Sequence, residues 1–490
     1  MALLASAGLL SGCLSPGLLP DRHQPLPADW QNRGELVREP VVELASWWQV
    51  FDDPVLDRLV SRTLAQNLTL AQASQRLRAA RALIRPALAQ GRPQLNASGG
   101  IQHQRRLSGA QGSEAISGGT GPDPSVPGLP PAQEQRTIGY YQTGFDAEWE
   151  IDLFGRAAAA ADSARASAGI AAAEAHMVRV SVVAELVRCY IELRGAQQRR
   201  LLLAGALNDQ EQQHALMQLR RQAGIASDAE PDRARAMVAE IAAQLPLLDQ
   251  AVQQAAQRLA ILGGELAIDP GLLVPAGQPN ARRIALPVIP ADLLRTRPDI
   301  QRAESTVAQA AAELDISVAE LYPRLSLSGD ILASGNLVGR PLPGPSRYAT
   351  AGLSFTLPLL DWGARRAVTG AREAELAAAI LGYRQTVLEG VEETENALGN
   401  LAAEQQRAAD VQVQVDAAQR ADRHAVLLHQ RGISSLIERL DAALARRQAE
   451  LTAVDSTERQ GLAIVALYKA VGGGAVEAFR SGATRTAPVR

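Results

Sequence analysis

The strictest alternation in the chain is the stretch TGFDAEWEIDLFG, residues 143–155. Successive side chains of a strand point to opposite faces, so one face here is apolar and the other acidic. The apolar face includes Phe145 and Trp149. The acidic face consists of Asp146, Glu148, Glu150 and Asp152. This pattern predicts a strand over about 137–153 whose two sides contact different environments.

A very long helix is predicted directly after this strand. Residues 156–222 contain no proline and are rich in Ala, Leu, Gln, Arg and Glu. A helix of about 65 residues would reach roughly 100 Å. It is too polar to lie in lipid, and propensity alone gives an isolated helix little stability. It must therefore pack against other helices along its length.

The same order of elements occurs twice. In each half, a helix precedes two strands and two further helices. The strands are predicted at about 93–107 and 137–153, then at about 323–333 and 347–359. Glycines occur at matching places in the two halves; for example, Gly155 and Gly363 lie 208 positions apart by subtraction. The predicted fold class is mainly α, with two helix–strand–strand–helix–helix repeats in the chain.

Composition argues against several classes of function. The chain has 490 residues and a net charge of −3, without a basic stripe for nucleic acid. It contains no phosphate-loop motif, nucleophile elbow or His/Cys ligand cluster, so the sequence indicates no enzyme, no cofactor and no metal site. It also lacks an apolar run of about 18 residues, which argues against a transmembrane helix.

The four predicted strands have the period and length of outer-membrane strands, but four cannot close a barrel. Two chains would supply eight strands and a filled interior, whereas three would supply twelve and a water-filled lumen. The acidic face would then line the lumen, and Trp149 would suit a membrane-interface aromatic girdle. The alternative is a soluble β-sandwich strand, which the small number of strands and the long helices disfavour.

The N-terminus, MALLASAGLLSGC, resembles a lipoprotein signal peptide. Leu10-Ser11-Gly12-Cys13 has the form of a bacterial lipobox, in which the signal is cut before the cysteine and the thiol takes a diacylglycerol. This segment is short and lacks the usual Lys or Arg, and a misplaced start codon would explain both features. The alternative is an ordinary signal cut after Ala5-Ser6-Ala7, which would leave Cys13 incidental.

Several longer motifs resemble the TolC-type outer-membrane efflux proteins, specifically the NodT/OprM-like lipoprotein branch that serves resistance–nodulation–division pumps. The motifs that carry this resemblance are WWQVFDDPVLDRLVSRTLAQNLTLAQASQRLRAARA (47–82), WEIDLFGR (149–156), LLRTRPDIQRAE (293–304), LYPRLSLSG (321–329), FTLPLLDWGARR (355–366) and RGISSLIERLDAALARRQAEL (431–451). RPDI followed by AE, together with the duplicated strand–glycine–helix junction, makes the resemblance specific.

The resemblance implies a trimer with a twelve-stranded β-barrel in the outer membrane, continued by a long α-helical barrel across the periplasm. It also implies a passive exit duct for drugs or other small molecules. The expected partners are further copies of the chain, a periplasmic adaptor protein, an inner-membrane resistance–nodulation–division pump and outer-membrane lipid. Two other functions remain open: a duct for type I protein secretion and a non-membrane coiled-coil scaffold.

The resemblance further implies a gate at the periplasmic tip. The family closes this tip with an apolar ring and an aspartate ring, which map to Ile437 and Asp441 in RGISSLIERLDAAL. These residues are four apart and share a helix face. The first-half counterpart of Asp441 is Arg233, so the acidic ring is not duplicated. The alternative for Asp441 is an ordinary surface charge on a helix.

The predicted organisation has six parts. They are a signal peptide at 1–12, a lipidated arm at 13–50, a first repeat at 51–264, a linker at 265–290, a second repeat at 291–473 and a C-terminal tail at 474–490. Among the remaining candidates, Cys189 is expected to be a helix-packing thiol. His424 and His429 are five apart, unlike a helical ligand pair, and are expected to be solvated.

Overall fold

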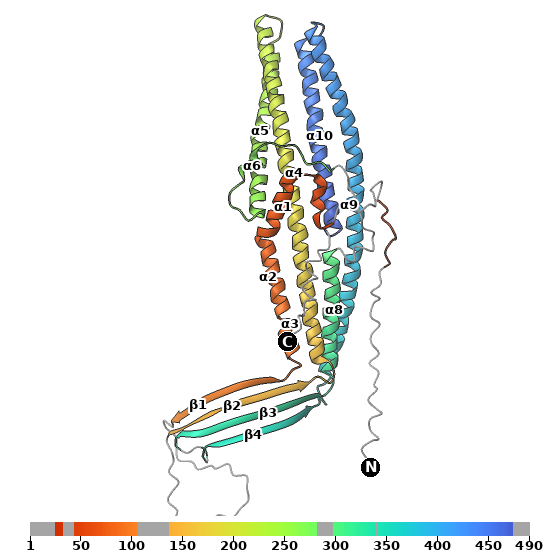
Figure 1. Ribbon diagram of the computed structural model, residues 1–490. Coiled ribbons are helices and arrows are strands. Elements are labelled where there is room, and N and C mark those ends of the chain that lie inside the picture. The colour runs from red at the N-terminus through yellow and green to blue at the C-terminus, as the bar shows by residue number, and fades with distance from the viewer. Residues whose placement is uncertain are drawn as a thin grey trace, which may run out of the picture. The chain divides into compact units, whose positions relative to one another are not determined.

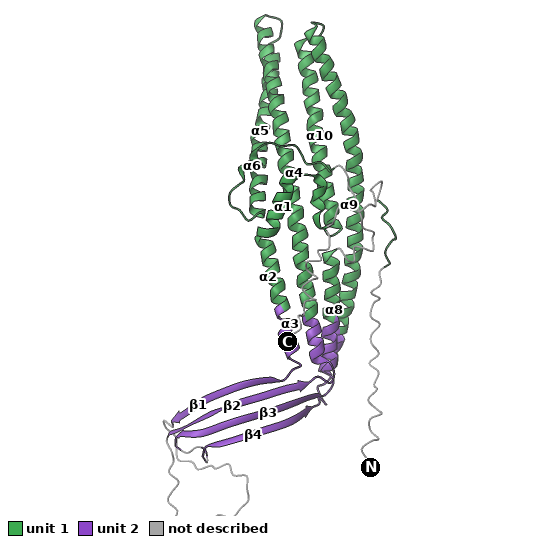
Figure 2. Ribbon diagram, in the orientation of Figure 1, with its two compact units in different colours: residues 1–81, 165–310, 373–490 green, residues 82–164, 311–372 purple. Residues whose placement is uncertain are grey.

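A computed structural model describes residues 25–32, 44–105, 137–281, 297–339, 342 and 344–473 (Figure 1). Cys13 and the predicted C-terminal tail from residue 474 lie outside these residues. The chain divides into two compact units (Figure 2). Unit 1 comprises residues 1–81, 165–310 and 373–490, and unit 2 comprises residues 82–164 and 311–372. Each unit therefore draws segments from both halves of the sequence.

Unit 2 contains a four-stranded antiparallel sheet. Its strands are β1 (Gln94–Arg105), β2 (Thr137–Ile151), β3 (Arg324–Val338) and β4 (Ser346–Thr356), in that order across the sheet. All four predicted strands are present, and the central pairing of β2 with β3 joins the two halves of the sequence. Strand β3 continues past its predicted end at residue 333, because β2 offers it backbone partners as far as Val338.

The two longest helices agree with the predictions from the sequence, which are about 156–222 and, in the second half, about 364–430. They are α4 (Arg156–Gln222) and α9 (Ala364–Gln430), each of 67 residues. Each follows a glycine in the left-handed region, with φ of 80° at Gly155 and 84° at Gly363. Other residues adopt that conformation at a cost of about 1–2 kcal/mol, so glycine sets the sharp change from strand to helix. The following helices are α5 (Ala229–Leu262) and α10 (Leu436–Ala470).

The helix that the sequence predicts before the first strand, over about 54–90, is broken into three helices. They are α1 (Pro54–Gln66), α2 (Leu68–Ala82) and α3 (Ile84–Ala89). Asn67 causes the first break, because its extended backbone ends α1 and its side-chain oxygen accepts a hydrogen bond from Leu70 N at 3.0 Å. Asn67 Nδ2 also donates to Leu262 O at 2.9 Å, which ties this break to the end of α5.

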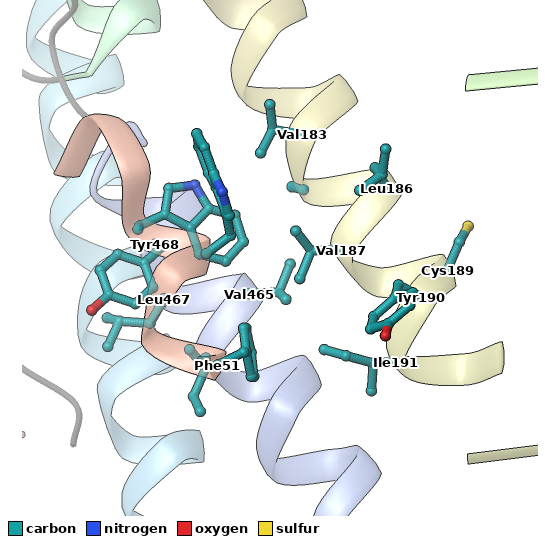
Figure 3. Close-up of a cluster of buried hydrophobic side chains, with 14 of the residues drawn as sticks. Phe51, Val183, Leu186, Val187, Cys189, Tyr190, Ile191, Val465, Leu467 and Tyr468 are labelled. Atoms are coloured by element: carbon teal, nitrogen blue, oxygen red, sulfur yellow. The ribbon is translucent and has the colours of Figure 1, made fainter. Parts of the chain in front are cut away.

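Two shorter helices lie in the predicted arm and the predicted linker. They are η1 (Leu44–Phe51) in the N-terminal arm and α6 (Pro270–Leu273) in the linker. Trp47 of η1 is only 2% exposed and stacks on Tyr468 of α10, with ring centroids 5.2 Å apart. Both residues belong to one buried apolar cluster, in which Figure 3 shows Tyr468 and Val465 of α10 together with Val187 and Leu186 of α4. Helix η1 is therefore part of the core of unit 1.

The RPDI motif forms a buried ionic clamp at the start of α8 (Pro298–Ala319). The Arg297 side chain is 9% exposed and donates to Asp299 and to Glu393 of α9, each at 2.7 Å. It also donates to the carbonyl of Ala470, at the end of α10, at 2.5 Å. Burial opposes the charged form, but the hydrogen bonds to Asp299 and Glu393 hold the pKa of Arg297 above its ordinary value. The motif thus joins three helices of unit 1.

Candidate functional site

The acidic side of the sheet is mainly polar. One row across all four strands consists of Asn96, Asp146, Asp330 and Thr350. Asn96 Nδ2 donates to Asp146 Oδ2 at 2.9 Å, and the Thr350 hydroxyl donates to Asp330. Glu148 lies in the next row, opposite Ser328 of β3. Both halves of the sequence therefore contribute polar side chains to this face.

Asp330 is a carboxylate that the predicted acidic set does not include. It lies directly opposite Asp146 in the register of β2 and β3. The sequence could have indicated Asp330, because Ser326, Ser328 and Asp330 alternate along β3 with the same period as the acidic strand.

The predicted acidic set differs from the structure at the end of β2. The strand stops at Ile151, and Asp152 instead accepts a hydrogen bond from Ala158 N in the first turn of α4, at 3.0 Å. Glu150 is within the strand but forms a bidentate ion pair with Arg156, with both N–O distances at 2.9 Å. Two of the four predicted carboxylates therefore stabilise the strand–helix junction.

The opposite side of the sheet is apolar and exposed. The side chains on it that are more than half exposed include Leu95, Ile101, Phe145, Ile331, Leu353 and Phe355. Trp149 shares this face as predicted, but it is half-buried, and its Nε1 donates to Gly91 O at 3.2 Å. A contiguous apolar surface of this kind marks contact with lipid or another protein.

The two helical hairpins of unit 1 end in matching turns. Gly224 after α4 and Gly432 after α9 have φ of 72° and 71°. In each turn the next residue, Ile225 or Ile433, donates its N–H to the carbonyl five residues earlier at 2.9 Å. This is the Schellman arrangement that closes helices with glycine. The two turns, whose glycines lie 208 positions apart in the sequence, therefore have matching hydrogen bonds.

The predicted gate residues lie just beyond the second turn. Ser435 begins α10 with a reciprocal capping box to Glu438. Ile437 is half-buried and Asp441 is exposed, one helical turn apart. The Asp441 carboxylate accepts a hydrogen bond from Gln213 Nε2 of α4 at 3.3 Å. Asp441 is thus in contact with the first-half hairpin of the same chain.

Two arginines that the sequence analysis did not single out link α10 to both long helices. Arg447 Nε lies 2.5 Å from Asp209 Oδ2 of α4. Arg446 lies 3.0 Å from Asp422 of α9 and 2.7 Å from Glu450 of its own helix. The two adjacent arginines in the sequence could have indicated these contacts. Adjacent residues on a helix point about 100° apart, so they can reach different neighbouring helices.

The cysteine and the two histidine candidates lie in different environments. Cys189 is buried, as predicted, and burial followed by the nearby Glu185 carboxylate raises the pKa of its thiol to about 12. His424 is exposed as predicted. His429 differs from the prediction, because it is half-buried and its Nδ1 lies 3.1 Å from Ser434 O in the tip turn.

Two kinds of feature are absent from the described residues. Among them, no group of three or more His, Cys, Asp or Glu side chains is arranged to hold a metal ion. In the same part of the chain, none of the helices combines the length and the hydropathy needed to cross a bilayer.

Similarity to known proteins extends over the sheet, the long helices and the tips. Residues 59–265 and 289–473 match the family described as Outer membrane efflux protein. Nodulation protein T of Rhizobium leguminosarum bv. trifolii is 29% identical over 90% of this chain and 91% of its own length. The pyoverdine export outer membrane protein OpmQ of Pseudomonas aeruginosa is 27% identical over 97% and 96%, respectively.

A solved structure shares the same architecture. The outer-membrane channel OprN superposes with a TM-score of 0.76 and 30% sequence identity, covering 93% of this chain and 99% of that one.

Proposed function

Since the chain belongs to the outer membrane efflux protein family, we propose that it is the passive exit duct of a tripartite efflux system in the outer membrane. The observation that carries the proposal is the two-sided sheet, apolar on one face and polar on the other, whose strands continue into helices of 67 residues. An apolar outer wall suits lipid, and a polar inner wall suits water.

The proposed duct requires several copies. Every residue of β1 and β4 is exposed in the single chain, and these are the edge strands of the sheet. Open edges are not tolerated in hydrocarbon, because their backbone groups would lack hydrogen-bond partners. Three copies would join edge to edge into twelve strands, and the lumen would be wide enough for water.

The inner wall of that barrel would be acidic. Asp146, Glu148 and Asp330 share the polar face of the sheet, and each copy would add the same set. Rings of carboxylates attract cations and slow anions, so the duct would favour cationic over anionic solutes.

The closed end would lie at the helical tips. Ile437 would supply the apolar ring and Asp441 the acidic ring, while Arg447 and Asp209 would brace the two hairpins of each chain. An adaptor protein and an inner-membrane resistance–nodulation–division pump would engage this end. The proposed duct is passive, so the energy for export would come from the pump.

Reconstitution of the purified chain into planar lipid bilayers tests the duct. Trimeric particles should insert and produce steps of ion conductance that favour cations. Asp441→Ala should raise the closed-state conductance several-fold, whereas the matched variant Arg233→Ala, at the equivalent first-half position, should leave it unchanged. A monomer that neither inserts nor conducts would contradict the proposal, and equal effects of the two substitutions would contradict the gate.

A further inference from the structure

A cavity of about 800 Å³ lies in unit 1, where several helix ends meet on α4. It forms at the break between α1 and α2, where the Asn67 side chain donates to Leu262 O at the end of α5. Helix α10 contributes its last turns, shortly before it ends at Ala470. A cavity of this volume is within the range of sites that bind small molecules.

The cavity lies on a different side of α4 from the apolar core. Glu185 and Arg188 of α4 line the cavity. Val183 and Val187, which belong to the buried cluster in Figure 3, are each two positions from Glu185 and therefore about 200° from it around the helix. A ligand in the cavity would not have to displace these core side chains.

Three helices each contribute one cation to the lining of the cavity. These cations are Arg188 of α4, Arg258 of α5 and Lys469 of α10. Lys469 is the only lysine in the sequence. The lining also includes one carboxylate, that of Glu185. The lining therefore carries a net positive charge, unlike the acidic face of the sheet in unit 2.

The carboxylates beside the two arginines are already engaged. Glu185 accepts hydrogen bonds from Arg188 at 2.8 Å and from Arg258 at 3.3 Å. Glu192 lies 2.6 Å from the other side of the Arg188 guanidinium. Lys469 is exposed, and among the described residues its ammonium has no ion-pair partner. It is therefore the charge that remains for a ligand.

The remaining lining is mostly apolar. Ile261 of α5 and Leu462 and Val465 of α10 are part of it, on the helices that carry Arg258 and Lys469. Two large apolar side chains at the cavity are open to solvent, since Ile261 is 52% exposed and Leu68 of α2 is 71% exposed. The cavity thus offers apolar surface beside an unpaired positive charge, which is the composition of a small-molecule site.

We propose that this cavity binds a small amphipathic anion, which has an apolar body and one carboxylate or sulfonate group. The anionic group would accept a charge-assisted hydrogen bond from Lys469, and the two arginines would add to the attraction. The apolar body would lie against Ile261 and Leu462. A cation of the same shape would meet three positive charges and no free carboxylate. The inference goes beyond the proposed function and does not depend on it, because the whole site lies in unit 1 of one chain.

Calorimetric titration of the purified full-length protein with naphthalene-2-sulfonate tests the charge of the site. The anion should bind saturably, with one molecule per chain. Lys469→Gln should weaken binding about tenfold, whereas Lys469→Arg should retain most of the affinity. The matched control Arg302→Gln removes a cation that is 53% exposed outside the cavity, and it should leave the affinity unchanged. The trimethylammonium analogue with the same naphthalene body should not bind.

A second pair of variants tests the apolar part of the site. Ile261→Ser should also weaken binding of naphthalene-2-sulfonate severalfold, because it removes apolar surface from the cavity. Its matched control is Ile225→Ser, at an isoleucine that is 68% exposed in the first tip turn. Both side chains are exposed, so neither substitution should prevent folding. Equal affinities of the two variants would contradict the proposed position of the apolar body.

The single lysine provides an independent measurement on the assembled protein. Acetic anhydride should acetylate Lys469, as detected by mass spectrometry, and bound naphthalene-2-sulfonate should slow this reaction severalfold. If Lys469 resists acetylation without ligand, another copy of the chain fills the cavity and the proposal is wrong. Equal binding of the anion and its cationic analogue, or equal losses in Lys469→Gln and Arg302→Gln, would also overturn it. The duct is tested separately by conductance, so failure of this site would leave the proposed function standing.

Discussion

At the scale of single residues, removing the Arg297 side chain should strongly lower the stability of unit 1. It is 9% exposed and bonds to two carboxylates and one carbonyl from three helices. Breaking a buried pair by removing one partner typically costs about 3–5 kcal/mol. We expect Arg297→Met to lower the free energy of unfolding by about 3 kcal/mol, measured as the shift in a urea transition followed by circular dichroism.

Arg302 provides the matched control on the same helix. Its ion pair with Glu174 is about half exposed on both sides, at 3.4 Å. Exposed pairs contribute about 0–1 kcal/mol, so Arg302→Met should shift the transition little. Equal losses from the two substitutions would show that the clamp has no special role.

Glu458 of α10 should make stability depend on pH. Burial raises its pKa above the ordinary value of 4.5, and Arg199, 2.8 Å away, only partly offsets this. Between the ordinary and the raised pKa the folded state binds more protons than the unfolded state, so stability falls as pH rises through that window. Glu458→Gln should flatten this decline, measured by unfolding midpoints from about pH 4 to about pH 8. The matched control Glu211→Gln, at an exposed position, should leave the decline as it is in the original protein. If stability declines equally with pH in the two variants, Glu458 is not the group responsible.

At the scale of elements, the pairing of β2 with β3 depends on a glycine. A Cβ at Gly144 would lie 2.2 Å from the carbonyl oxygen of Ile331, a backbone atom that cannot move without breaking the ladder. Gly100 on β1 has nothing within 4 Å of the same added atom. Gly144→Ala should therefore strongly reduce assembled protein in the outer membrane, while Gly100→Ala should accumulate normally, as judged by immunoblots of membrane fractions. Comparable levels of the two variants would contradict this account.

The elements also show what local sequence could and could not predict. The bounds of α4 and α9 were predictable because Gly155, Gly224, Gly363 and Gly432 act locally at each end. The contacts of Arg297 with Glu393 and Ala470 were not, because these two partners lie 96 and 173 residues away in the sequence. Periodicity likewise identified the apolar and acidic faces of β2 but not the end of the strand. That end is set by Asp152, whose preference for capping α4 overrides the alternation.

At the scale of the whole molecule, the described residues of a single chain include two surfaces that the chain itself does not cover: the apolar face of the sheet and its two edge strands. Lipid can cover the apolar face, but only further copies can satisfy the backbone groups of the edge strands. The proposed ring is the arrangement in which each copy covers an edge strand of its neighbour.

If that ring holds the protein in the bilayer, the predicted lipid at Cys13 should be a secondary anchor. Each buried methylene contributes about 0.8 kcal/mol, and stable anchoring needs more than one acyl chain. A closed barrel in the same molecule would already exceed that contribution. Cys13→Ala should therefore remain in the outer membrane and keep part of its export activity, measured by fractionation and by drug susceptibility of a complemented strain. Complete loss of the variant from the membrane, while Gly100→Ala is retained, would instead show that the lipid is the principal anchor.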